Sequence, residues 1–221
     1  MSAFEPDARF KFLGADGRSP YADHPWPLPR GSGPGAWVKA KGPLVACENG
    51  IHVVTLPHLL VWANDRLYTV ETRGECVDAG NKLVVREARL LHRVETWNDT
   101  TARLFACDCA ERALRRVTAR HGKQDPRSWK ATRVARKFAR GEATRTDLAA
   151  AWAAARDAAR AAARDAARAA ARDAARAAAW DAAGDAARAA AGAAERDWQC
   201  SRLLQYVSGA DVEPMRVPDV E

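Results

Sequence analysis

Apolar and polar positions alternate residue by residue over residues 67–72, the pattern of a half-buried β-strand. Turn-forming residues follow at 78–81. A short helix beginning with Pro57 fits residues 56–63. Further short strand candidates lie at residues 10–13, 82–85 and 89–94. Residues 36–98 are therefore expected to form a β-rich region.

The periodicity changes to helical spacing after residue 98. A helix over residues 99–120 would present an apolar face made of Leu104, Cys107, Ala110, Leu114 and Val117. Asp125 followed by Pro126 marks the start of a second helix, which ends before Gly141. These two helices are expected to open the C-terminal half of the chain.

Residues 148–208 are dominated by alanine, the residue with the strongest helix preference. Their middle repeats the sequence RDAARAAA. Thr144 and Asp147 have the form of a capping box before the tract, and Gly209 is a stop signal after it. A continuous helix of this length would measure roughly 90 Å at a rise of 1.5 Å per residue.

Two glycines and three tryptophans interrupt the alanine tract. Gly184 and Gly192 favour a break into two antiparallel segments, because each glycine costs about 1 kcal/mol relative to alanine in a helix. From Ala149 to Cys200 its only large apolar side chains are Trp152, Trp180 and Trp198, which are expected to mark where it docks. Nothing in the tract carries chemistry, so it is expected to be a rigid scaffold.

These elements predict an α+β protein. The expected β-rich domain covers residues 1–98 and begins with a Pro- and Gly-rich segment, whose aromatic residues indicate that it wraps over a core. The expected helical domain covers residues 99–209, and residues 210–221 are expected to form a tail. A chain of 221 residues has room for both domains.

The net charge of +7 is concentrated in one segment. Residues 103–147 contain thirteen Lys and Arg against five Asp and Glu, a difference of +8 that accounts for the whole basic excess. No apolar run approaches the length of a membrane span, and no secretory signal is recognisable at the N-terminus. Five cysteines without framework spacing favour a reduced, cytoplasmic location.

Cys47 and His52 are the best candidates for catalytic chemistry. The turn residues Asn49 and Gly50 between them would bring both side chains close together. A cysteine beside a histidine can act as a nucleophile with its base. The same pair can bind zinc if further ligands approach, and the candidates are His58, Cys76 and His24. The alternative is a tight hairpin with a buried cysteine and a histidine hydrogen-bonded to the backbone.

Cys107 and Cys109 look like a metal motif, but on a helix their sulfurs would point about 200° apart. Cys107 falls on the predicted apolar face and is expected to be a buried thiol. The chain has no phosphate-binding loop, dinucleotide fingerprint, nucleophile elbow or metalloprotease helix. We therefore expect no metal and no cofactor, and a non-enzymatic protein is favoured.

The basic segment predicts a surface that binds an acidic partner. The partner-binding candidates on its two helices are Arg112, Arg115, Arg116, Arg120, Lys130, Arg133, Arg136, Lys137 and Arg140. An acidic protein is the favoured partner. Nucleic acid is the alternative, with the cations contacting phosphates and Trp129 or Phe138 stacking on bases.

Two segments of the chain resemble known families. The first is carried by Gly35-Ala36-Trp37-Val38, Cys47-Glu48-Asn49-Gly50-Ile51-His52, Leu67-Tyr68-Thr69-Val70-Glu71, Gly74-Glu75, Lys82-Leu83-Val84 and Arg89-Leu90. Over roughly residues 10–98 this pattern resembles a domain of unknown function from actinobacterial and phage proteins. The resemblance implies no established activity.

The second resemblance is carried by Cys109-Ala110-Glu111-Arg112-Ala113-Leu114, Asp125-Pro126-Arg127, Ala139-Arg140-Gly141-Glu142-Ala143-Thr144 and residues 199–206. Over roughly residues 101–208 the chain is similar to an immunity protein family associated with bacterial toxin systems and phage genomes. This resemblance implies a helical protein-binding module without catalytic residues.

We therefore expect a cytoplasmic, non-enzymatic protein that binds a macromolecule through its basic helices, in an immunity-like or phage-accessory role. Nucleic-acid binding by the same helices is one alternative. A group-transfer enzyme centred on Cys47 and His52 is another, and it requires a concave pocket that contains both side chains.

Overall fold

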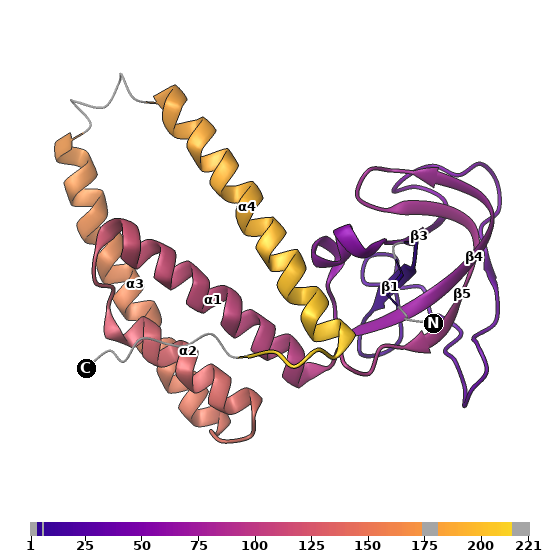
Figure 1. The fold of residues 1–221 in the computed structure, drawn as a ribbon, viewed down its shortest axis with the longest axis horizontal. Coiled ribbons are helices and arrows are strands. Elements are labelled where there is room, and N and C mark those ends of the chain that lie inside the picture. Colours follow the sequence, from indigo (N-terminus) through magenta and orange to yellow (C-terminus); the bar gives the residue numbers. More distant parts are fainter. Residues whose placement is uncertain (1–3, 6, 174–180, 214–221) are drawn as a thin grey trace. The chain divides into compact units, whose positions relative to one another are not determined.

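A computed structural model of the protein describes residues 4, 5, 7–173 and 181–213, without the side chains of residues 121, 161–173 and 181–190. An antiparallel sheet forms in the N-terminal half and helices form in the C-terminal half (Figure 1). The predicted α+β class is confirmed. The chain divides into two compact units: unit 1 comprises Met1–Asp99 and Gln199–Val212, and unit 2 comprises Thr100–Trp198 and Glu213–Glu221.

Five antiparallel strands form the sheet of unit 1. Their bounds are β1 Arg9–Leu13, β2 Val38–Lys39, β3 Ile51–Val53, β4 Arg66–Asp78 and β5 Leu83–Arg93. The order is β1-β4-β5-β2, and β3 also pairs with β5. Val54, directly after β3, exchanges two backbone hydrogen bonds of 2.8 and 2.9 Å with Phe10 of β1. The pairing thus returns from β3 to β1, and the sheet closes into a small ring.

A long hairpin joins β4 and β5 where the sequence predicts a strand and a turn. The Asp78 carboxylate accepts a 2.7 Å hydrogen bond from the N–H of Gly80, which has a φ of 81°. The pairing of β4 is irregular between Arg73 and Cys76, where Gly74 has a φ of 78°. A bulge of this kind bends a hairpin without ending it. The two strand candidates at 82–85 and 89–94 are therefore parts of one strand.

A cluster of buried apolar side chains forms the core of the sheet: Leu13, Trp26, Ile51, Val53, Tyr68, Val70, Val85, Ala88 and Leu90. Trp26 belongs to the Pro- and Gly-rich N-terminal segment, and its indole N–H donates a 2.8 Å hydrogen bond to the Ser19 hydroxyl. The prediction that this segment wraps over a core is confirmed.

Unit 1 also contains a short helix and the end of the chain's last helix. The short element is a 3-10 helix, η1 Leu56–Trp62, with a proline in its first turn as predicted. Residues 199–212 group with unit 1, and the Thr96 hydroxyl donates a hydrogen bond to the Val207 carbonyl. Leu203 and Val207 are buried. The expected helical domain 99–209 therefore differs from unit 2 at its C-terminal end.

In the part of the chain that the structure describes, four α-helices follow the sheet: α1 Asp99–His121, α2 Pro126–Ala139, α3 Arg145–Asp173 and α4 Asp181–Ser208. The Asp125 carboxylate caps α2 by accepting a 2.8 Å hydrogen bond from the Arg127 N–H. Thr144 and Asp147 form the predicted capping box at α3, since each side chain accepts a hydrogen bond from the other's backbone N–H, at 3.1 and 2.9 Å. Both predicted helix starts are confirmed.

The alanine tract falls in α3 and α4. Residues 174–180, which include Trp180, lie outside the described residues. Helix α4 runs through Gly184 and Gly192, so the break expected near one of them is not found there. Two glycines at about 1 kcal/mol each do not outweigh the helix preference of the alanines around them.

The other two tryptophans of the tract have different surroundings. Trp152 in α3 is 54% exposed. Trp198 in α4 lies under the guanidinium of Arg112 from α1, with 4.3 Å from the guanidinium carbon to the ring centroid. Of the two, Trp198 is therefore the one that anchors its helix to another element of the described structure.

The interior face of α1 differs from the predicted one. Cys107 is buried as predicted, and burial raises the pKa of its thiol to about 11. Val117 is 41% exposed, whereas Asp108 and Glu111 are fully buried. Neither charged residue belongs to the predicted apolar face, and both can be buried because a buried cation from α2 neutralises them.

That cation is Arg136. Its Nη2 lies 2.7 Å from the Asp108 carboxylate and 2.9 Å from the Glu111 carboxylate, and its side chain is 9% exposed. Burial alone would lower the pKa of Arg136, but its hydrogen bonds to Asp108 and Glu111 raise it. Burial raises the pKa of Glu111, and Arg136 opposes that rise. The three side chains form an ion triad that joins α1 to α2 in the interior of unit 2.

None of the described helices has the length and apolar composition that crossing a bilayer requires.

Candidate ligand-binding site

A cavity of about 430 Å³ opens in unit 1 beside strands β1 and β3. Its walls include Lys11, Trp26, Cys47, Glu48, His52 and Trp62. The volume lies in the range of pockets that bind small molecules. The concave pocket that the enzyme hypothesis requires around Cys47 and His52 is therefore present.

The loop before β3 presents Cys47 to this cavity. The Asn49 side-chain amide donates 2.6 Å hydrogen bonds to the carbonyls of Lys41 and Pro43, and Asn49 also pairs with Val45 through the backbone. Gly50 has a φ of 132°, and a Cβ there would lie 2.3 Å from a methyl group of Val84. The loop needs glycine at that position, because the backbone packs directly against β5.

Cys47 has a left-handed backbone conformation, with a φ of 68°. This conformation is uncommon for a residue with a side chain and is often found at functional sites. The Cys47 N–H lies 3.4 Å from Nε2 of His52, which accepts a hydrogen bond from it. The predicted proximity of Cys47 and His52 is confirmed, but their contact involves the backbone N–H of Cys47 and not its sulfur.

The sulfur of Cys47 has a different partner. Nζ of Lys82 lies 3.0 Å from the Cys47 Sγ. Lys82 is 7% exposed, and its ammonium also lies 4.9 Å from the ring centroid of Trp62. The pair is therefore Cys47 with Lys82, while His52 supports the loop. Cys47 itself is exposed, which corrects the alternative of a buried cysteine in a hairpin.

A second lysine, Lys11, lines the cavity itself. Its Nζ donates a 2.9 Å hydrogen bond to the His52 carbonyl and lies 5.2 Å from the ring centroid of Trp26. Burial, together with the charge of Lys82, lowers the pKa of Lys11 to about 8. Burial, followed by the charges of Lys82 and Lys11, lowers the pKa of His52 to about 4. At neutral pH the cavity therefore holds a cationic Lys11 beside a neutral imidazole.

Lys11 and Lys82 were not identified from the sequence, because they lie 41 and 35 residues from the loop residues they contact. One signal was available for Lys11. It is the only charged residue in the apolar run Phe10-Lys11-Phe12-Leu13, where a strand places a lysine among buried side chains. Lys82 gave no such signal, since it follows a turn where lysine is ordinary.

The described residues do not provide the further ligands that a zinc site at Cys47 and His52 would require. Among the residues that the structure describes, no three His, Cys, Asp or Glu side chains come together as a metal site. His24 lines the same cavity, but its ring packs edge-on against Trp26, at 6.3 Å between centroids.

The basic helices are the second candidate site, but several of their arginines form ion pairs with carboxylates of the same chain. Nε of Arg112 and Nη1 of Arg116 lie 2.8 and 2.5 Å from the Glu195 carboxylate of α4. Arg136 is buried in the ion triad. Arg115 is half-buried. Arg112, Arg116 and Arg136 thus hold the helices together, which is a role that the charge pattern did not distinguish from partner binding.

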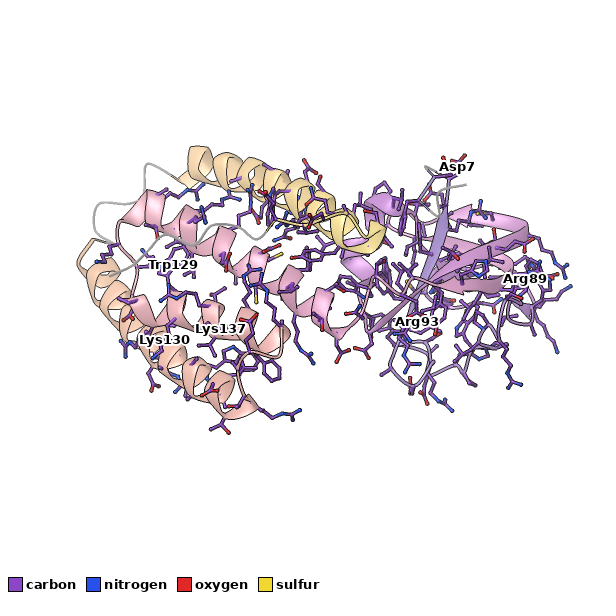
Figure 2. All side chains as sticks on the ribbon, turned by 60° about the horizontal axis from the view of Figure 1, so that its bottom comes forward. Asp7, Arg89, Arg93, Trp129, Lys130 and Lys137 are labelled. Atoms are coloured by element: carbon purple, nitrogen blue, oxygen red, sulfur yellow. The ribbon has the colours of Figure 1, made fainter. Side chains whose placement is uncertain are left out.

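The remaining cations gather on α2. Lys130, Arg133, Lys137 and Arg140 recur every three or four residues and thus share one side of the helix. We call these four residues the basic face of α2; Figure 2 shows Lys130 and Lys137 on it. Lys130, Lys137 and Arg140 are exposed, and Arg133 is half-buried. No ion pair to another described residue holds any of the four, in contrast to Arg112 or Arg136. Arg120 is exposed on α1.

Comparison with known proteins gives no match to a family model, a curated protein or a solved structure. The functional inference therefore rests on the geometry of the two candidate sites.

Proposed function

We propose that unit 1 binds a small organic anion in the cavity beside β1 and β3. The observation that carries the proposal is a pair of ammonium groups: Lys11 lines the cavity, and Nζ of Lys82 lies 3.0 Å from the sulfur of Cys47, which also lines it. No described carboxylate forms an ion pair with either of them, although Glu48 also lines the wall. A buried charge without a counter-ion is unfavourable. An anionic ligand would supply that counter-ion.

The walls of the cavity indicate what else the ligand contains. The rings of Trp26 and Trp62 border it, and Tyr21 packs edge-on against Trp62 at 5.8 Å between ring centroids. Aromatic walls favour flat apolar groups. A lysine ammonium has three donors, so each lysine can bind a ligand oxygen beside its present contact. A carboxylate or phosphate joined to a flat apolar group satisfies both requirements.

The test is calorimetric titration of the full chain with benzoate and with phenyl phosphate. Lys11→Met and Lys82→Met are each expected to weaken binding roughly tenfold to a hundredfold, because a charge-assisted hydrogen bond contributes about 1.5–3 kcal/mol. Lys39→Met is the matched control, since the Lys39 side chain is 66% exposed on β2 and pairs with Glu87. Equal affinity of all four proteins for both anions would refute the proposal.

A second function is favoured by a separate observation, the unpaired basic face of α2. We propose that Lys130, Arg133, Lys137 and Arg140 bind an acidic protein, in line with the immunity-like role implied by the resemblance. Helix α2 keeps its apolar side inside unit 2, with Trp129 and Ala139 buried. Its cations are therefore available without unfolding the helix.

This second proposal is tested by reversing the charge of Lys130, Arg133 and Lys137 to Glu and repeating a lysate pull-down with and without nuclease. The control reverses the exposed residues Arg30, Lys39 and Lys41 of unit 1, which gives the same change in net charge. A protein that survives nuclease and is lost only from the α2 variant is expected. Recovery of nucleic acid alone would replace the protein partner with the nucleic-acid alternative.

A further inference from the structure

We infer that Cys47 is an acyl acceptor: its sulfur takes the acyl group of an anionic acyl thioester bound in the cavity, beside the ammonium of Lys82. This inference deepens the proposed anion-binding function and rests on it. It replaces the expected Cys47–His52 catalytic pair with a Cys47–Lys82 pair.

The first argument is the position of the sulfur. Cys47 is exposed and lines the cavity, while its sulfur lies 3.0 Å from the Lys82 Nζ. Cys76 in β4 is also an exposed free cysteine, but it does not line the cavity. An ammonium at this distance attracts the negative charge of a thiolate, which is the nucleophilic form of cysteine. Lys82 is 7% exposed, so water screens this attraction only weakly.

The second argument is that the structure holds the nucleophile in a fixed and costly conformation. The Cys47 backbone is left-handed, and the hydrogen bond from its N–H to His52 secures the loop from the β3 side. On the opposite side of the turn, the Asn49 side chain secures the loop to two carbonyls. Strained residues held from several directions are typical of reactive centres. His52 is thus a positioning residue here, since it does not touch the sulfur.

The third argument concerns the chemistry that the site can complete by itself. The Cys47 thiolate attacks the carbonyl carbon of the thioester, a new C–S bond forms, and the original C–S bond breaks. The departing thiolate takes up the proton that Cys47 lost, so the products are S-acyl-Cys47 and a free thiol. This exchange of one thioester for another needs no oxidant, reductant or metal, and it is chemically balanced.

The cavity also provides for the anionic part of the donor. Lys11 lines the same cavity. Its ammonium donates one hydrogen bond to the His52 carbonyl and has further N–H donors for a ligand oxygen. The charged groups at the site are therefore Lys11 and Glu48, which line the cavity, and Lys82, which contacts the sulfur of Cys47; His52 and His24 also line the cavity. The excess of positive charge favours a donor that carries a carboxylate.

The experiment uses the full chain and S-benzoyl-mercaptoacetate, a thioester with an aromatic acyl group and a carboxylate. Intact mass and peptide mapping report how fast each cysteine gains a benzoyl group. Cys47→Ser is expected to abolish the fast, saturable acylation, while Cys76→Ser leaves it unchanged. Lys82→Met is expected to slow acylation of Cys47 roughly tenfold or more. Benzoate, the non-covalent probe, is expected to protect Cys47 by competition.

The outcomes separate the two proposals. If benzoate binds but Cys47 is acylated no faster than Cys76, the acyl-acceptor inference is overturned and anion binding stands. If Lys82→Met leaves the rate unchanged, the role of the ammonium is overturned. If benzoate fails to bind while Cys47 still reacts faster than Cys76, the anion-binding proposal fails and the reactive cysteine stands. Failure of both measurements removes both proposals.

Discussion

Single residues around the cavity have their protonation set by burial and by each other. The pKa of Lys11 is lowered to about 8 and that of His52 to about 4, and for both residues burial is the main cause. Near neutral pH, Lys11 is therefore a cation that can lose its charge within a mildly alkaline range. His52 is neutral, so Nε2 can accept the hydrogen bond from the Cys47 N–H.

Anion binding is predicted to weaken as pH rises through about 8. Lys11 is charged below its pKa of about 8 and neutral above it, so the attraction for a ligand carboxylate is present on the acid side and lost on the alkaline side. Lys11→Arg is the matched variant, because a guanidinium keeps its charge throughout this range. Titrations with benzoate at several pH values should show the loss for the wild type only. A wild-type affinity that is flat through this range would contradict the role of Lys11.

The neutral state of His52 predicts a loss of stability in mild acid. The unfolded chain binds a proton at His52 near the ordinary pKa of 6.5, whereas the folded protein does so near 4. Between these values the unfolded state binds more protons, so the free energy of unfolding falls as pH is lowered from about 6.5 to about 4. Thermal unfolding of the wild type and of His52→Gln should show a shallower pH dependence for the variant. An identical slope would show that His52 is not responsible.

The contacts of Cys47 could be predicted from the sequence only in part. Asn49 and Gly50 predicted a turn; the structure places the turn at residues 46–48, between Val45 and Asn49, and Cys47 and His52 still lie in contact as predicted. The contact of Lys82 with the sulfur depends on the register of β3 and β5, in which Val53 lies opposite Leu83. Periodicity identifies strands but does not fix which strands pair, so this contact could not be predicted.

At the scale of elements, the sequence predicted the helix caps correctly but gave no indication of which charged residues of the helices are buried. The caps at Asp125 and Thr144 were predictable because a helix start depends on residues that are neighbours in the chain. The interior face of α1 was mispredicted because Asp108 and Glu111 are buried by virtue of Arg136, 28 and 25 residues away. A pattern that counts every charged residue as exposed cannot find such a triad.

Arg136→Met is predicted to destabilise unit 2 by about 3–5 kcal/mol, because it leaves two carboxylates buried without a cation. Asp108 and Glu111 are both 0% exposed, so water does not reach them. The matched variant replaces the whole triad, with Asp108→Leu, Glu111→Met and Arg136→Met together. Its stability should lie close to that of the wild type, since no charge is left buried. Denaturant unfolding followed by helical circular dichroism compares the three proteins.

At the scale of the whole molecule, the chain passes between the two units at residues 99–100, at 198–199 and again at 212–213. The first boundary coincides with the change from strand to helix periodicity, and the sequence could indicate it. The second falls inside α4, where the helical pattern continues without a signal. The grouping of residues 199–212 with unit 1 depends on contacts such as that of Thr96 with Val207, 111 residues apart.

Leu203→Ala is therefore predicted to loosen unit 1 although it lies in the last helix. Leu203 is fully buried, and truncating a buried leucine to alanine costs about 2–5 kcal/mol. Hydrogen exchange should show faster exchange in β4 and β5, with α2 unchanged. Ser201→Ala, an exposed position in the same helix, is the control. Faster exchange confined to α2 would contradict the assignment of this segment to unit 1.

The return of the chain to unit 1 has a consequence for biosynthesis. A ribosome releases the strands of unit 1 first, then the whole of residues 100–198, and only afterwards Leu203 and Val207. Unit 1 therefore cannot be completed before α4 has been synthesised, because α4 supplies the Val207 carbonyl that accepts the Thr96 hydrogen bond and the buried Leu203. Apart from Glu213, all described residues of unit 2 precede residue 199, so unit 2 can complete its fold earlier. Premature termination before residue 203 would thus leave unit 1 without Leu203 and Val207, although all of its strands have already been made.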